Sequence, residues 1–143
     1  MSSAEAVSEV TVPRQPAGTF LRLYDCCRPH GDALLVLSVQ VGAPGLSASI
    51  GIETLEGDGL AQFVRELDDD FRGWAGERTW TSFRGDLQLR AIHTGRAVLL
   101  AWTLRFPEPA ESDPGAWEAT VRVQISPGED LKALSSDLHA FLE

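Results

Sequence analysis

The sequence contains few of the residues that mark a metal site, a disulfide framework or a membrane segment. Of its 143 residues two are cysteines, one is a methionine, and Lys132 is the only lysine among twelve basic residues. It has no run of about 18 apolar residues, so no membrane-spanning helix is expected. Its first residues include Glu5 and Glu9 where a secretory signal would have an apolar stretch. We therefore expect a cytoplasmic protein.

The two cysteines, Cys26 and Cys27, are adjacent. A disulfide between sequence neighbours is strained, and a reducing compartment keeps thiols free, so both are expected to be thiols. With His30 they supply three metal ligands, whereas structural zinc takes four in a tetrahedron. Adjacent residues on a strand also point to opposite faces. We expect no metal site and no cofactor.

Sequence signatures of nucleophile elbows, phosphate-binding loops and dinucleotide-binding glycine motifs are missing, which favours a non-enzymatic role. Twenty-one acidic residues against twelve basic ones give a net charge of -9 and a pI of about 4.7. Nucleic acids and anionic membranes bind mainly through Lys and Arg, so neither is an expected partner. The electrostatic field of an acidic protein instead attracts basic partners.

Apolar and polar residues alternate regularly over much of the chain, which is typical of strands with one buried face. This pattern predicts strands over residues 19–26, 34–41, 46–54, 79–93, 96–106 and 116–125. Short connections predict antiparallel hairpins, and Gly85 within the fourth strand predicts a bulge or bend. The 96–106 stretch is apolar on both faces, which predicts a central strand or one at an interface. Arg and Glu on the outward faces are expected to form cross-strand pairs.

Two segments change to the helical period. In the first, Asp58 is the expected N-cap and Gly73 the left-handed terminal residue; its apolar face consists of Leu60, Phe63, Val64, Leu67 and Phe71. In the second, Ser126, Pro127 and Glu129 form an expected capping box; its apolar face consists of Leu131, Leu134, Leu138, Phe141 and Leu142.

The resulting order β-β-β-α-β-β-β-α predicts an α+β fold. We expect a single antiparallel β-sheet of about six strands, with two amphipathic helices packed on one face. Residues 17–143 are expected to form one domain, the usual number at this length. Residues 1–16 are rich in Ser, Ala, Glu and Pro without periodicity, which predicts a flexible N-terminal tail.

The most distinctive segment reads Phe71-Arg72-Gly73-Trp74-Ala75-Gly76-Glu77-Arg78-Thr79-Trp80-Thr81-Ser82. It resembles a family of short uncharacterised proteins from high-GC bacteria, a domain of unknown function, whose helix ends in a W-R-G-W-x-G-x-R-x-W-x-S pattern. The resemblance covers about residues 34–142 and includes Leu87, Leu89, Ala91, His93, Gly95, Trp117, Gly128, Glu129 and Leu131. Phe71 replaces the first Trp, and Thr94 stands where the family has Asp, so no His–Asp role is expected. The resemblance implies a fold and no chemistry.

The same segment supplies a candidate partner-binding surface, because Trp and Arg dominate the energetics of protein interfaces. The candidate residues are Arg72, Trp74, Arg78, Trp80, Asp68, Asp69 and Asp70. The alternative is a rigid helix-to-strand corner, in which the tryptophans fill the core and the arginines pair with carboxylates. Three consecutive carboxylates diverge by about 100° each along a helix, so they do not converge on a metal ion.

Together these features predict a non-catalytic protein-binding factor of the immunity or antitoxin kind, with a basic protein as its partner. One alternative is a homodimeric accessory or structural protein that uses the 96–106 strand as its interface. Another alternative is a small ligand-binding module or enzyme with a pocket lined by Trp74, Trp80, Trp102 and Trp117.

Overall fold

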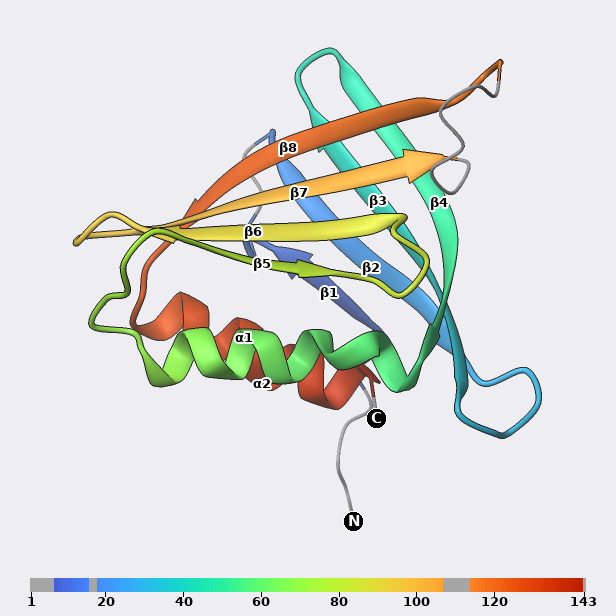
Figure 1. Ribbon diagram of the computed structural model, residues 1–143, viewed down its shortest axis with the longest axis horizontal. Coiled ribbons are helices and arrows are strands. Elements are labelled where there is room, and N and C mark those ends of the chain that lie inside the picture. The colour runs from blue at the N-terminus through green and yellow to red at the C-terminus, as the bar shows by residue number, and fades with distance from the viewer. Residues whose placement is uncertain (1–6, 16–17, 107–113, 143) are drawn as a thin grey trace.

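A computed structural model describes residues 7–15, 18–106 and 114–142, which form two four-stranded antiparallel sheets and two α-helices (Figure 1). Sheet A contains β1 (Glu9–Val12), β2 (Phe20–Cys27), β3 (Leu34–Ala43) and β4 (Leu46–Leu55), in that order. Sheet B contains β5 (Glu77–Thr81), β6 (Leu87–His93), β7 (Val98–Phe106) and β8 (Trp117–Ile125). The 3-10 turn η1 (Glu56–Gly59) and helix α1 (Leu60–Asp69) connect the sheets, and α2 (Glu129–Leu142) follows β8.

The predicted single sheet of about six strands is wrong, because the strands divide into two separate sheets. The antiparallel pairing and the broad α+β character are confirmed. Each half of the chain runs through four consecutive paired strands and then a helix. Alternation shows which face of a strand is buried, but it does not show which strands share a sheet. The helix after β4 carries the chain to a new edge strand instead of back to the first sheet.

The sequence pattern did not predict β1, and it merged β5 and β6 into one strand. Glu9–Val12 lies within the predicted flexible tail, yet it pairs with β2 and buries Val10 and Val12. Residues 1–6 and 16 of that tail lie outside the described residues. The predicted long strand 79–93 is two strands joined by a tight turn. There Gly85 has a φ of +79°, and its N–H donates to the Ser82 carbonyl at 2.9 Å. The bend predicted at Gly85 is therefore a complete reversal of the chain.

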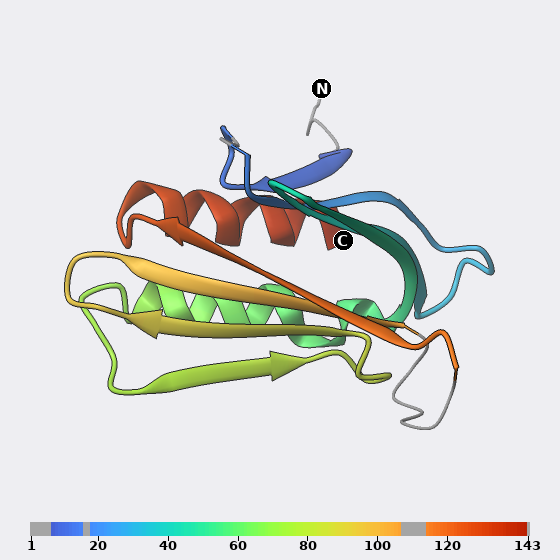
Figure 2. The ribbon, with the colours of Figure 1, turned by 90° about the horizontal axis from the view of Figure 1, so that it is seen from above.

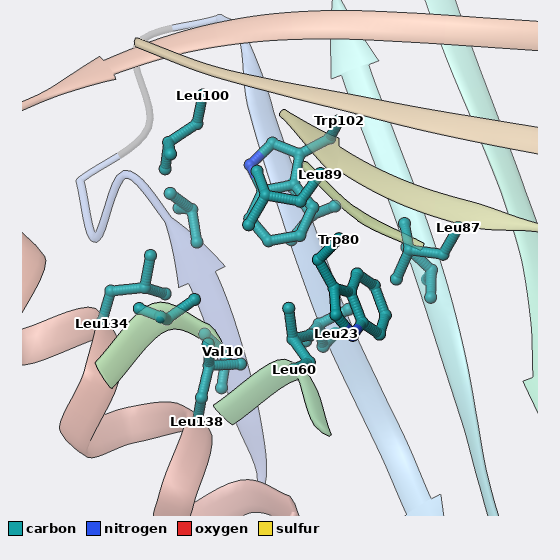
Figure 3. Packing of buried hydrophobic residues seen from close by; sticks show 14 of the residues in the cluster. Val10, Leu23, Leu60, Trp80, Leu87, Leu89, Leu100, Trp102, Leu134 and Leu138 are labelled. Carbon is teal, nitrogen blue, oxygen red and sulfur yellow. The ribbon is translucent and has the colours of Figure 1, made fainter. Parts of the chain in front are cut away.

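The two sheets lie face to face, and both helices lie side by side across one end of them (Figures 1 and 2). Strands of one sheet cross those of the other at a steep angle in Figure 1. The inward faces of both sheets and the apolar sides of the helices form one core, in which Leu23, Leu89, Trp102 and Leu138 are fully buried (Figure 3). Burying such a side chain stabilises the fold by about 1.5–3 kcal/mol.

Strand β7 is the central strand that its two-sided apolar pattern predicts, since it pairs with both β6 and β8. Cross-strand ion pairs are also confirmed on the outward faces: Arg105 contacts Glu118 at 3.0 Å, and Arg22 contacts Glu9 at 2.8 Å. Among the described residues, no helix is long and apolar enough to cross a bilayer.

The helix ends differ in detail from the predictions. Gly59, in a left-handed conformation, is the N-cap of α1 in place of Asp58. The helix ends at Asp69, so Phe71 follows it and is 44% exposed instead of packing in the core. At α2 the Ser126 hydroxyl accepts a bond from the backbone N–H of Asp130 at 3.2 Å, and the Asp130 carboxylate accepts one from the Ser126 N–H at 2.9 Å. The predicted reciprocal cap is therefore present, but its acidic residue is Asp130 instead of Glu129.

Candidate functional site

The structure divides the predicted partner-binding residues between a packed corner and an open groove. The corner joins the end of α1 to β5. In it the Arg78 guanidinium contacts the Asp70 carboxylate at 2.8 Å and lies 5.1 Å from the centre of the Trp74 ring. The Trp74 indole N–H donates to the carbonyl of Ala91 at 3.3 Å. These residues are paired with one another, as the corner alternative predicted.

His93 stabilises this corner through hydrogen bonds, a role that the sequence pattern did not predict. Its Nδ1 accepts a hydrogen bond from the Gly95 N–H at 2.9 Å, and its Nε2 lies 2.8 Å from the Phe71 carbonyl oxygen. Because a backbone N–H can only donate, Nε2 carries the proton and donates to Phe71. The ring also meets Trp74 edge-on, with centroids 5.2 Å apart. His93 therefore ties the β6–β7 turn to the segment that follows α1.

Trp80 points from β5 into the core and is 8% exposed (Figure 3). Its indole N–H donates to the carbonyl of Asp58 at 2.8 Å. The Asp58 carboxylate in turn accepts bonds from the backbone N–H groups of Leu55 at 2.8 Å and Phe83 at 2.9 Å. Although it is not the helix cap, Asp58 connects the end of β4 with two parts of sheet B.

Asp68, Asp69 and Phe71 line a groove of about 500 Å³ between the end of α1 and the start of α2, which we call the helix-end groove. Its other wall consists of Pro127, Gly128, Glu129 and Lys132. The exposed Phe71 ring is an apolar surface within it. Its lining thus combines three carboxylates, one ammonium group and a phenyl ring.

The carboxylates of the helix-end groove form no close ion pair among the described residues. Within residues 7–15, 18–106 and 114–142, no ion pair of 4.0 Å or less involves Asp68, Asp69 or Glu129. The Arg72 guanidinium lies over the Phe71 ring, with its carbon 5.6 Å from the ring centroid. The groove lining therefore carries three carboxylates and one ammonium group beside the partly exposed Phe71 ring.

The four tryptophans do not surround a common pocket. Trp80 and Trp102 fill the core, and Trp74 is covered by Arg78 and His93. Trp117 is 37% exposed at the start of β8 and stacks on Phe106 with centroids 6.0 Å apart. This arrangement does not support the ligand-binding module or enzyme with a Trp-lined pocket.

Cys26 and Cys27 are free thiols near the end of β2. Burial raises the pKa of the half-buried Cys26 thiol, because a thiolate loses hydration there. Cys27 is exposed on the neighbouring position of the strand. In the part of the chain that the structure describes, no three His, Cys, Asp or Glu side chains are placed to hold a metal ion.

Residues 12–143 match the model of a family described as a family of unknown function, DUF6228. The chain belongs to this family. No curated protein and no solved structure matches it. The predicted relation to an uncharacterised family is confirmed at this level, while the high-GC origin and the cytoplasmic location stay predictions. Because the function of DUF6228 is unknown, membership in it assigns no activity to this chain.

Proposed function

We propose that the protein is a non-catalytic factor that binds a basic segment of another protein in the helix-end groove. The observation that carries this proposal is the set of unpaired carboxylates, Asp68, Asp69 and Glu129, around the exposed ring of Phe71. Long basic side chains match this chemistry, since their apolar stems pack on a ring while their charged ends reach carboxylates. A volume of about 500 Å³ has room for such side chains.

Charges beyond the groove support the same partner. The carboxyl end of α1 contributes a partial negative charge beside Asp68 and Asp69. The amino end of α2 contributes a partial positive charge, but Glu129 and Asp130 in its first turn offset it. The net charge of -9 adds an attractive long-range field for a cationic protein. An immunity- or antitoxin-like factor that covers a basic toxin surface is one specific form of this proposal.

Amide chemical-shift mapping with a short peptide rich in Arg and Leu tests the location of binding. The proposal expects perturbations to concentrate on Asp68, Asp69, Phe71, Gly128 and Lys132. A matched acidic peptide should leave these resonances unchanged. Perturbations spread evenly over the acidic surface would contradict a groove and indicate diffuse attraction.

A matched pair of double variants separates local from general charge. Asp68→Asn with Asp69→Asn removes two carboxylates from the groove, and we expect about five- to tenfold weaker binding of the peptide. Asp25→Asn with Glu77→Gln removes the same charge elsewhere on the described surface, and should weaken binding less than about twofold. Equal losses in the two double variants would overturn the proposal.

A further inference from the structure

Strand β4 has an open edge, because sheet A ends with it and β3 lies on its other side. Antiparallel neighbours alternate between pairs that exchange hydrogen bonds and pairs that do not. The Glu56 N–H donates to the Ala33 carbonyl at 3.0 Å, in line with the β3–β4 register, so the even-numbered residues of β4 bond to β3. The N–H and C=O groups of the odd-numbered residues therefore point to the open edge; these are Ser47, Ser49, Gly51 and Glu53.

Over most of its length, β4 carries no feature that prevents its edge from pairing with another strand. From Leu46 to Ile52 it has no charged residue and no proline, the usual devices against edge pairing. The other edge strands carry such devices: β1 is four residues long and ends before Pro13, β5 carries Glu77 and Arg78, and β8 carries Glu118 and Arg122. Among the described residues, no backbone hydrogen bond joins the odd-numbered β4 residues to another element.

We propose that two copies of the chain pair antiparallel along their β4 edges and join two A sheets into one eight-stranded sheet. A twofold axis at Ser49 places Ser49 opposite its counterpart and Ser47 opposite Gly51 of the other copy. All three facing pairs are small residues, which allows the backbones to approach to strand spacing. This register also opposes odd-numbered to odd-numbered residues, whose free backbone groups are the ones that face the edge.

The half-buried apolar residues of β4 favour a second copy as the occupant. Leu46, Ala48 and Ile50 lie on the core-facing side of the strand and are only partly covered. In the proposed register Ala48 lies opposite Ile50 of the other copy. The half-buried apolar residues of one β4 strand therefore lie beside the same residues of the other. Figure 1 shows that the β3–β4 hairpin projects beyond β8, and Ser47 and Ser49 on this part of the strand are exposed.

A cleft beside residues 50–53 of β4 receives the β3–β4 hairpin of the other copy in this arrangement. It measures about 410 Å³ and is lined by Ile50, Gly51, Glu53, Arg84, Asp86, Arg105 and Phe106. In the register centred on Ser49, Gly45 at the hairpin tip lies opposite Glu53 of the other copy. The small, exposed tip, Pro44 and Gly45, therefore comes next to this cleft in both copies at once.

Sedimentation velocity over a micromolar to millimolar range tests the dimer. We expect a reversible dimer, and Ser47→Lys with Ser49→Lys should raise its dissociation constant at least tenfold, since like charges would face each other across the axis. Thr79→Lys with Thr81→Lys adds the same charge to the edge strand β5 and should leave the dimer intact. A wild-type monomer throughout this range, or equal effects of both double variants, would overturn the proposal.

Cross-linking keeps the test informative if the lysine variants fold poorly. In a Cys26→Ser, Cys27→Ser background, Ser49→Cys should form an intermolecular disulfide under mild oxidation, because the two positions face each other at the axis. Thr79→Cys is the matched control and should remain a thiol. Equal cross-linking at both positions would contradict the register. The salt dependence distinguishes this interface from the helix-end groove. Added salt screens the repulsion between two copies of charge -9, so it should strengthen the dimer. The same screening should weaken the binding of a basic peptide to the groove.

Discussion

The indole N–H of Trp80 donates to the backbone carbonyl of Asp58 across 2.8 Å, and this bond joins sheet B to the turn that follows sheet A. The carboxylate of the same aspartate accepts the N–H groups of Leu55 and Phe83. Asp58 has a φ of +54°, a conformation that side chains other than Asn, Asp and Gly rarely adopt. One residue in a strained conformation thus connects both halves of the molecule.

Substitution of Asp58 tests this connection. Asp58→Ala removes two charge-assisted bonds and places a poorly suited residue at positive φ, so we expect a loss of about 2–4 kcal/mol in the free energy of unfolding. Asp58→Asn keeps an acceptor oxygen and tolerates the conformation, and should cost about 1 kcal/mol. Urea unfolding of the two variants measures both values. Equal losses would show that the acceptor oxygen and the tolerance of positive φ, which Asn retains, contribute little.

The two buried tryptophans should respond differently to loss of the indole N–H. Trp102 is fully buried, yet its Nε1 has no hydrogen-bond partner among the described residues, whereas Nε1 of Trp80 bonds to Asp58. We expect Trp80→Phe to cost about 2–3 kcal/mol and Trp102→Phe about 1–2 kcal/mol, measured by urea unfolding. Burial alone predicts the reverse order, so a larger loss for Trp102→Phe would contradict the role given to the Asp58 bond.

Gly57 allows η1 to approach the end of α2. Its φ is +83°, and a Cβ there would lie 3.1 Å from Cδ1 of Leu142. Gly59 has a similar φ of +81° with nothing within 4 Å of such a Cβ. Gly59→Ala should therefore cost about 1–2 kcal/mol through backbone strain, and Gly57→Ala about 1 kcal/mol more through the contact. Thermal unfolding of both variants checks the difference, and identical melting temperatures would exclude close packing of η1 on Leu142.

The adjacent cysteines should differ in reactivity. Burial raises the pKa of Cys26, so at any given pH less of it is thiolate, the form that alkylating agents attack. We expect iodoacetamide to modify the exposed Cys27 first and Cys26 more slowly, with the gap narrowing as the pH rises. Peptide mass spectrometry after timed alkylation measures the two rates. In denaturant the rates should converge, and faster modification of Cys26 in the folded protein would show that it is not shielded.

Most individual elements could be predicted from the sequence, but their assembly could not. Period-two alternation locates a strand and its buried face, and this held for β3, β4, β7 and β8. It does not encode where one sheet ends and another begins, because that depends on the path of the chain after β4. β1 was missed since four residues next to Pro13 give too short a pattern. The turn within 79–93 depends on the Ser82–Asp86 side-chain bond at 2.7 Å, a contact that periodicity does not register.

The candidate site could be predicted only in part for a related reason. The residues around Trp74 are consecutive in the chain, so their grouping was visible, but their pairing with Ala91 and His93 depends on tertiary structure. The helix-end groove was not visible, because its second wall begins at Pro127, far along the chain from Asp68. Phe71 fitted the helical period, and its exposure follows from the helix ending two residues earlier.

The affinity of a basic peptide for a single aromatic variant tests the central claim most directly. Phe71→Ala changes no charge, yet it removes the apolar surface on which a basic stem would pack, so peptide binding at about 0.15 M salt should weaken about three- to fivefold. Phe83→Ala removes a ring that is 80% exposed on the β5–β6 turn and should leave the affinity unchanged. If Phe71→Ala binds the peptide as well as the wild type, the helix-end groove is not the binding site.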